Sequence, residues 1–274
     1  MGSRNKNTNI LVVKHDYNAG DLITILPGLQ EIHRRTGKKL AIYQRLNLPA
    51  FHYDGAPHPI QDEHGHTVSM NRKMFDFLRP LLIAQDYIED FLPWEGEQAD
   101  FDFALTRDQK SVPMPHGSIH HWPMITFPQL NCDLGEPWID YTDKYETDPY
   151  ILINRTQRYY NPVISYHFLK DLQHCCKFVG TKQEHEMFCF EFGLEIEYLE
   201  AANAVDLASI IYSCSLFIGN QSFCWHLADA MKVPRLLELS PQFPNTWPTG
   251  AHGHIFAHQN SLEYFVSLFS KSLK

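Results

Sequence analysis

The sequence predicts an α/β protein with two doubly wound parallel sheets. In the second half of the chain, short apolar runs start about every twenty residues, which is the combined length of one strand and one helix. Segments with helical patterns lie between these runs, and such alternation is typical of a parallel sheet covered by helices. The first half opens with the same succession of strand, polar turn and helix, so we expect two lobes.

The second lobe is the more regular of the two. Its expected strands are the apolar runs 150–153, 176–179, 194–198, 216–218, 235–239 and 254–256. Its expected helices are 162–173, 182–192, 204–213, 222–231 and 261–270. Leu207, Ile210 and Ile211 illustrate the helical pattern, because their spacing places them on one face. Gln221 or Ser222 is expected to cap the helix at 222–231.

The first lobe is reduced and rich in loops. A strand at 10–13 leads through a polar turn into a helix, for which Thr24 is the expected N-cap and Pro27 a first-turn residue. This helix is expected to end at Arg35. The other expected elements are a strand at 40–43, a helix at 72–83 and a strand at 101–105.

A polar stretch at 141–149 has no apolar periodicity and is the expected linker. The lobes are therefore expected to span 1–145 and 146–274.

Composition excludes several classes of protein. The 274 residues are 44% hydrophobic and 20% charged, a balance that supports a folded core and excludes a disordered or coiled-coil chain. With 32 acidic and 23 basic side chains the net charge is -9, so the chain as a whole repels nucleic acids and anionic membranes. The 16 histidines reduce this excess in mild acid.

No targeting or membrane segment is expected. The first residues are polar, and the most apolar stretch, 208–219, is interrupted by polar side chains and falls short of the ~20 residues of a membrane span. The 6 cysteines lack CxxC spacing and are expected to be reduced thiols. We therefore expect a soluble, cytoplasmic protein.

Three polar turns follow predicted strands. The first contains Gly20 and Asp21, the second runs from Gly180 to Glu184, and the third begins at Gly219. Ligands of doubly wound sheets bind at the carboxyl ends of the strands. We therefore expect these turns to line a site in a cleft where the two lobes face each other.

The three turns resemble those of the ADP-heptose:lipopolysaccharide heptosyltransferases, glycosyltransferase family 9, and their wider GT-B relatives. The first-lobe loop of the family reads Gly-Asp, an apolar stretch and Pro, and its Asp falls on Asp21. Its second-lobe turn reads Gly-x-Asp-Ser/Thr-Gly-x-x-His, which corresponds here to Gly219-Asn220-Gln221-Ser222-Phe223-Cys224-Trp225-His226. The family's glutamate near the nucleotide ribose falls on Glu184. The resemblance covers most of 150–239 and about 10–43.

This resemblance implies a GT-B fold, with two Rossmann-like lobes facing across a cleft. The first would be the acceptor-side lobe and the second would bind the nucleotide sugar. The implied reaction is transfer of a sugar from a nucleotide-diphosphate sugar to a hydroxyl acceptor, with inversion at the anomeric carbon. The nucleotide sugar is then a co-substrate, and no cofactor is expected.

The residue types suit this reaction. A hydroxyl nucleophile needs a carboxylate to take its proton, and Asp21 is the candidate base. The backbone N–H groups of a helix beginning near Ser222 can stabilise a departing diphosphate without a metal. Ser222 and His226 add hydrogen-bond donors, and Arg155 and Arg158 could contact the same phosphates. The candidate donor-site residues are Arg155, Arg158, Gly180, Glu184, Gly219, Asn220, Gln221, Ser222 and His226.

Each assignment has a structural alternative. Asp21 could cap a helix, where the helix dipole would make it a weaker base. Glu184 could be a solvated acid in the first turn of its helix. Arg155 and Arg158 could form surface ion pairs, and His226 could be a core histidine.

Aromatic and histidine side chains of the first lobe offer an acceptor surface. The candidates are Gly20, beside Asp21, and the rings of His116, His120 and Trp122, since flat rings stack on sugars. The histidine clusters at 64–66, 116–121 and 252–254 lack the helical i, i+4 spacing with an acid partner that a metal site commonly shows, so no metal site is expected.

Gln221 and Phe223 depart from the family pattern. Gln221 replaces an anionic acceptor that could bind sugar hydroxyls, and Phe223 adds bulk where backbone should approach phosphate. The donor therefore need not be ADP-heptose. Two alternatives stay open: a catalytically silent protein of this fold that binds nucleotides or glycans, and a DNA-modifying glycosyltransferase, which the acidic balance disfavours.

Overall fold

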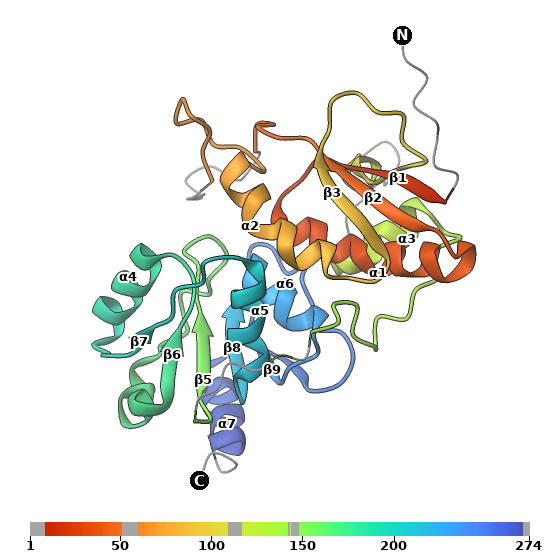
Figure 1. The fold of residues 1–274 in the computed structure, drawn as a ribbon. Helices are drawn as coiled ribbons and strands as arrows, with labels where there is room; N and C mark the ends of the chain where they lie inside the picture. The colour runs from red at the N-terminus through yellow and green to blue at the C-terminus, as the bar shows by residue number, and fades with distance from the viewer. Residues whose placement is uncertain (1–8, 51–59, 109–116, 142, 144–147, 271–274) are drawn as a thin grey trace. The chain divides into compact units, whose positions relative to one another are not determined.

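The computed structural model describes residues 9–50, 60–108, 117–141, 143 and 148–270 (Figure 1). These residues form two compact units. The first holds described residues 9–50, 60–108 and 120–133, and the second holds 117–119, 134–141, 143 and 148–270. Each unit is built on its own parallel sheet.

The first unit contains a four-stranded sheet in the order β3-β2-β1-β4. Its strands are β1 (Ile10–His15), β2 (Lys39–Gln44), β3 (Ile88–Pro93) and β4 (Phe101–Asp102), and all pairs are parallel. The register places His15 beside Gln44 where β1 and β2 both end. Strand β3 was not expected, because Glu89 and Asp90 interrupt its apolar run. At the edge of a sheet, these acids can face solvent.

Helix α1 (Ala19–Thr36) begins earlier than the sequence predicts. Its N-cap is Asn18 rather than Thr24, and Pro27 lies inside the helix. The expected N-cap was therefore wrong. Proline disfavours a helix interior, but α1 buries most of its length from Ala19 to Ile32, and this burial outweighs the local penalty. Gly37 ends the helix at φ 66, a left-handed conformation that suits glycine.

The remaining elements of this part are short. Helix α2 (Arg72–Ile83) lies where expected and is capped by Asn71, whose side chain accepts from the Met74 N–H at 2.8 Å. The expected strand at 101–105 is only Phe101–Asp102 and continues as the 3-10 turn η1 (Phe103–Arg107). The 3-10 turn η2 (Ile119–His121) and helix α3 (Trp122–Thr126) follow.

The second unit contains a six-stranded parallel sheet in the order β10-β9-β8-β5-β6-β7. Its strands are β5 (Ile151–Asn154), β6 (Cys176–Phe178), β7 (Glu197–Tyr198), β8 (Leu216–Asn220), β9 (Arg235–Glu238) and β10 (Gly253–Phe256). Each lies within or beside an expected run, although the run at 194–198 contributes only its last two residues.

Four helices accompany this sheet among the described residues: α4 (Lys182–Phe192), α5 (Ala204–Ser213), α6 (Phe223–Ala230) and α7 (Gln259–Ser270). Ser222 caps α6 by accepting from the Trp225 N–H at 3.1 Å, as expected. The helix expected at 162–173 was wrong, since the chain forms the 3-10 helix η3 (His167–Cys175) there. The Asn161 side chain accepts from the Val163 N–H at 3.2 Å, so a side-chain turn occupies the place of a helix start.

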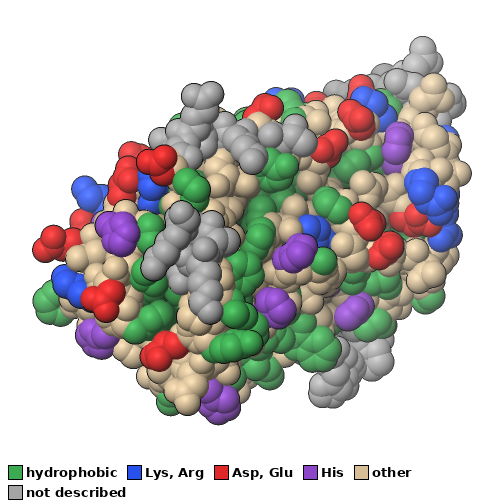
Figure 2. Space-filling model, turned by 90° about the horizontal axis from the view of Figure 1, so that it is seen from below, with side chains coloured by type: hydrophobic (Ala, Val, Ile, Leu, Met, Phe, Trp, Pro, Cys, Tyr) green, Lys and Arg blue, Asp and Glu red, His purple; other side chains and the backbone are tan. Residues whose placement is uncertain are grey.

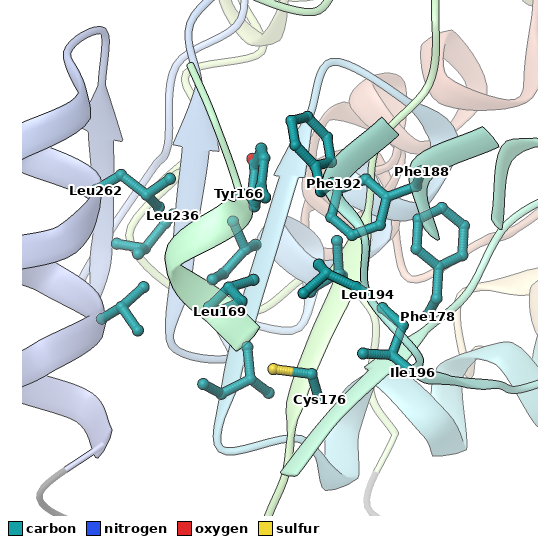
Figure 3. Close-up of a cluster of buried hydrophobic side chains, with 14 of the residues drawn as sticks. Tyr166, Leu169, Cys176, Phe178, Phe188, Phe192, Leu194, Ile196, Leu236 and Leu262 are labelled. Atoms are coloured by element: carbon teal, nitrogen blue, oxygen red, sulfur yellow. The ribbon is translucent and has the colours of Figure 1, made fainter. Parts of the chain in front are cut away.

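Aromatic side chains pack together with aliphatic ones in one core of the second unit (Figure 3). Tyr166 packs against Phe188 and Phe192 with ring centroids 5.1 and 5.4 Å apart, and Phe178 lies 5.4 Å from Phe188. This cluster joins β6 to α4 and to the segment that leads into η3. Truncating one of these rings to alanine typically costs about 3–5 kcal/mol.

A buried polar network holds the chain that follows β9. Arg235 and Asp229 are fully buried and joined by a 2.6 Å bond from Nε to Oδ1. Arg235 also donates to the carbonyls of Val233, Ala251 and Thr249. Lys232 donates to the Leu134 carbonyl at 2.8 Å. These bonds anchor the last residues of a stretch, 240–252, that has no helix or strand.

Among the described residues, no helix combines the length and the apolar character needed to cross a membrane.

Candidate functional site

In the first unit, Asp21 lies in the first turn of α1, directly after β1 and its loop. Its carboxylate is nearly covered, with 10% of the side chain exposed. Arg107, at the end of η1, donates from Nε to Asp21 Oδ1 at 3.0 Å and from Nη2 to the same oxygen. The helix N-terminus and the guanidinium both favour the ionised carboxylate.

Two aromatic rings hold Arg107 in place. Its guanidinium carbon lies 5.6 Å from the centre of the Tyr17 ring and 5.2 Å from that of Trp122. The Tyr17 hydroxyl donates to the Ala104 carbonyl at 2.7 Å, which fixes this ring against η1. The ion pair with Asp21 therefore has a defined geometry although 35% of the Arg107 side chain is exposed.

His15 ends β1 and is completely buried. Its Nδ1 lies 2.7 Å from Gln44 Oε1, while Gln44 Nε2 donates to the carbonyls of Tyr17 and Arg45. Because this network makes Gln44 Oε1 the acceptor, we assign the hydrogen to His15 Nδ1 and a lone pair to Nε2. Burial lowers the pKa of His15, opposed by the bond to Gln44 and by the charges of Asp21 and Asp16, so the ring is neutral at pH 7.

Asp16 forms ion pairs with two cations, Lys14 and Arg45. Its Oδ2 lies 3.4 Å from both Lys14 Nζ and Arg45 Nη1. Lys14 also contacts Asp102 at 3.0 Å. Both cations lie over the Trp94 ring, at 5.4 and 5.1 Å from its centre.

The expected acceptor residues have different positions. Gly20 lies in the first turn of α1, next to Asp21. Trp122 is buried and contacts Arg107, which brings it to the Asp21 cluster. His120 is buried in η2. His116 lies outside the described residues.

The second unit contains a pocket of about 750 Å³. It lies at the carboxyl end of its sheet, bounded by the loop after β5, one face of α4 and the chain after β9. The lining residues are Arg155, Thr156, Gln157, Arg158, Tyr160, Pro162, Glu184, Met187, Phe188, Glu191, Pro241 and Gln242. A pocket of this size can hold a nucleotide.

Arg155 lines this pocket but its donors are committed to the protein. Its Nε donates to both Glu238 carboxylate oxygens at 3.0 and 3.2 Å, and Nη2 donates to the Asn161 carbonyl at 3.3 Å. Glu238 is buried and also accepts from the Asn161 N–H at 2.5 Å and the Tyr166 hydroxyl at 2.7 Å. Arg155 thus forms a buried ion pair rather than the surface pair that was the alternative, and its contact with phosphate stays a prediction. Arg158 lines the pocket beside Tyr159.

Glu184 and Gly180 shape the start of α4. Thr181 and Glu184 form a capping box, in which Glu184 Oε2 accepts from the Thr181 N–H and hydroxyl, both at 2.9 Å. Glu184 nevertheless lines the pocket. Gly180 has a φ of 144, and a Cβ there would lie 2.8 Å from Asn154 Nδ2.

The turn 219–222 is held by side chains that end two strands. Asn220 accepts from the Thr156 N–H at 2.9 Å and donates to the Thr156 carbonyl at 2.7 Å. The Ser222 hydroxyl donates to Asn154 Oδ1 at 2.7 Å. A Cβ at Gly219 would lie 2.9 Å from the Asn154 carbonyl oxygen, so only glycine fits between these strands.

His226 and Gln221 complete this turn. His226 is 3% exposed within α6. Gln221 Oε1 is buried and has no hydrogen-bond partner within the described part of the chain. Neither residue lines the pocket of the second unit.

His15, Arg107 and Glu238 were not singled out by sequence reasoning. His15 and Glu238 are the last residues of β1 and β9, and Gln44, Asn154 and Asn220 end β2, β5 and β8. A polar residue at the end of an apolar run was therefore the sequence feature that could have identified His15 and Glu238. Arg107 had no comparable pattern, because it pairs with a residue 86 positions away.

Comparison with solved structures places the fold. No family model and no curated protein matches the sequence. A family 9 glycosyltransferase from Veillonella parvula matches 97% of this chain and 93% of its own, with 12% identity and a TM-score of 0.59. The E. coli heptosyltransferase WaaC with ADP-2-deoxy-2-fluoro heptose matches 94% and 99%, with 11% identity and a TM-score of 0.59. E. coli ADP-heptose lps heptosyltransferase II matches 97% and 100%, with 12% identity and a TM-score of 0.57. The expected resemblance is thus confirmed at the level of the fold: the two parallel α/β sheets match those of GT-B heptosyltransferases.

Proposed function

We propose that the protein is an inverting, metal-independent glycosyltransferase that moves a sugar from a nucleotide-diphosphate sugar to a hydroxyl acceptor. The observation that carries this proposal is the fold match to sugar transferases over 94–97% of the chain. Fold alone does not define an activity, so the assignment also needs suitable residues. The reaction requires a base and a donor site, and we assign these to Asp21 in the first unit and to the pocket in the second.

In this proposal Asp21 is the general base. Its carboxylate takes the proton of the acceptor hydroxyl while the oxygen attacks the anomeric carbon. The bond from that carbon to the diphosphate oxygen breaks, and the nucleoside diphosphate leaves with the electron pair. Attack opposite the leaving group inverts the anomeric configuration.

The donor nucleotide is assigned to the second unit. Arg158 and the first N–H groups of α6 can offset the charge of the diphosphate. Glu184 lines the pocket and is assigned to the ribose side, by analogy with the family. Gly180, which precedes the N-cap of α4, is assigned to the same donor site. Arg155 acts indirectly, because its pairing with Glu238 holds the loop that contributes Thr156, Gln157, Arg158 and Tyr160 to the pocket.

Nucleotide binding is the first test. Thermal unfolding of the full chain is measured with UDP, ADP, GDP, CMP and dTDP. At about 100 times Kd, a bound ligand stabilises the folded state by about 2.7 kcal/mol, which raises Tm by several degrees. A chain whose Tm is unchanged by every nucleotide would not be a nucleotide-sugar transferase.

Substitution of the base is the second test. Asp21→Asn should reduce transfer by about 10²–10⁴-fold while nucleotide affinity stays unchanged, because the amide cannot take a proton. Asp90→Asn is the matched control, since Asp90 also binds an arginine, Arg79, at 2.7 Å in the same unit. Full transfer by Asp21→Asn would remove Asp21 from the mechanism.

Gln221 and Phe223 favour a second candidate, a silent protein that binds nucleotides or glycans without turnover. Gln221 occupies the place of an acid in the heptosyltransferase pattern, and Phe223 that of a glycine. This candidate predicts a nucleotide-dependent rise in Tm, no transfer with any donor, and no effect of Asp21→Asn.

A further inference from the structure

Polar atoms without partners gather in the loop between β1 and α1. Within the described part of the chain, His15 Nε2, Asp16 Oδ1 and Asn18 Oδ1 are buried and have no hydrogen-bond partner. His15 is 0% exposed and Asp16 is 7% exposed. Buried polar groups are nearly always hydrogen-bonded, so three such atoms in four consecutive residues indicate a place for a ligand.

The three atoms share one chemical character, because each accepts hydrogen bonds. The bond from His15 Nδ1 to Gln44 leaves a lone pair on Nε2. Asp16 uses Oδ2 for its ion pairs with Lys14 and Arg45, which leaves Oδ1. A matching ligand must therefore donate several hydrogen bonds, as a sugar with its hydroxyl groups does.

The position of Asn18 supports this interpretation. Asn18 is the N-cap of α1, a position from which asparagine commonly accepts a backbone N–H, but its side chain makes no cap hydrogen bond. Its amide group thus stabilises no helix end. Trp122 Nε1 also lacks an acceptor among the residues described, and the oxygen of a hydroxyl can accept from it.

Among the described residues, the charges of this cluster are balanced in number. Lys14 and Arg45 pair with Asp16, Lys14 also pairs with Asp102, and Arg107 pairs with Asp21. These are three cations and three carboxylates. A phosphorylated or carboxylated ligand would have to draw one of these cations away from its acid, whereas a neutral polyol would not.

We propose that the first unit binds a neutral, polyhydroxylated acceptor, such as an uncharged sugar residue, whose hydroxyls donate to His15 Nε2, Asp16 Oδ1 and Asn18 Oδ1 next to Asp21. The inference rests on the proposed function, since it names the acceptor class for the same base. It assigns His15, Asp16 and Asn18 to acceptor binding and excludes an anionic headgroup as the primary determinant.

The test measures binding of defined probes to the full-length protein. Methyl glucoside, methyl galactoside and methyl mannoside are compared with glucose 6-phosphate and glucuronic acid by saturation-transfer NMR and calorimetry. A neutral glycoside should bind more tightly than either charged sugar. Asn18→Ala should weaken that glycoside by about 2- to 10-fold, the loss of one neutral hydrogen bond, with little change in Tm.

Asn71→Ala is the matched control in the same unit. Asn71 caps α2 through a 2.8 Å bond, so its replacement should lower Tm and leave glycoside affinity unchanged. His15→Phe removes the lone pair and should weaken the same glycoside further. Tighter binding of the charged sugars, or equal glycoside affinity in Asn18→Ala and the wild type, would overturn the inference; the second result would mean that ordered water alone satisfies these atoms.

The outcome is separable from that of the proposed function. If nucleotides bind and transfer proceeds to a charged acceptor, the inference fails and the function stands. If no nucleotide binds but a neutral glycoside binds with the stated Asn18 dependence, the function fails and the inferred site stands.

Discussion

Arg107 sets the chemistry of a single carboxylate. A guanidinium beside Asp21 favours its ionised form, which orients the base but makes it weaker. His15 and Tyr17 also face this cluster, and the charges of Asp16, Asp21 and Arg107 act on both. The proposed base is thus adjusted by several neighbours, and Arg107 is in direct contact with it.

Replacing Arg107 by Met should change the pH dependence of transfer. Without the guanidinium the ionised carboxylate loses a stabilising charge in direct contact with it, so the acid limb of kcat/KM should move to higher pH. The measurement is a pH profile of the variant against the wild type. Arg79→Met, which removes the partner of Asp90, should leave the profile in place. An unchanged acid limb in Arg107→Met would mean that this pair does not tune the base.

His15 should make stability depend on pH. Its pKa is lowered in the folded state by burial, while in the unfolded chain it is about 6.5. As the pH falls below that value, the unfolded chain takes up a proton that the folded chain excludes, so stability falls until the folded-state pKa is passed. Tm measured from pH 7.5 to pH 5 should therefore fall less in His15→Gln than in the wild type. Identical slopes would argue against a neutral, buried His15.

At the scale of elements, the loop after β5 depends on one buried ion pair. Arg155 and Glu238 join the end of β5 to the end of β9, and Tyr166 and Asn161 complete the bonds of the carboxylate. The pair positions the side chains of this loop along the pocket. Loss of one partner leaves an uncompensated charge in the interior.

Glu238→Gln should therefore destabilise the protein by about 3–5 kcal/mol and weaken nucleotide binding. Glu191→Gln is the control. Glu191 also contacts Arg155, at 3.5 Å, but 55% of its side chain is exposed, so its loss should cost less than about 1 kcal/mol. Denaturant unfolding and nucleotide titration of both variants check this. Equal losses of unfolding free energy in the two variants would show that burial of the Arg155–Glu238 pair does not determine its contribution to stability.

The elements that were predicted correctly are those with a strong local pattern. The strands of the second sheet and helices α2, α4 and α5 follow apolar periodicity and caps. Strand β3 and helix η3 were missed because sheet-edge position and the Asn161 side-chain turn override that pattern. The start of α1 was misplaced because its burial compensates for Pro27, a tertiary effect that no local rule contains.

The site was predictable in part for the same reason. Asp21 and the turn at 219–222 carry recognisable spacing. The structure places Asp21 in the first turn of α1 and the turn at the end of β8. The commitment of Arg155 to Glu238 and of Asp21 to Arg107 depends on partners 83 and 86 positions away. Such pairs exist only after folding.

At the scale of the whole molecule, the net charge and its distribution disfavour the DNA-modifying alternative. The net charge is -9, and on the face shown in Figure 2 acidic, basic and histidine side chains are interspersed among the described residues, with no large basic patch. Binding to a polyphosphate needs several lysines or arginines in one area.

Duplex DNA should therefore not bind measurably at about 0.15 M salt. Fluorescence anisotropy with a labelled duplex, at low and at physiological salt, checks this. Binding that is tight and weakens steeply with salt would restore the DNA-modifying alternative.

The network around Arg235 has a consequence for variation in sequence. In the stretch after β9, the network bonds to the carbonyls of Thr249 and Ala251, which are main-chain atoms. Among the described residues of this stretch, the one side-chain group that takes part in these bonds is the Thr249 hydroxyl. Every amino acid supplies a carbonyl. Pro241 and Gln242 line the pocket and make none of these bonds, so their exchange should alter the pocket wall while the network around Arg235 stays intact.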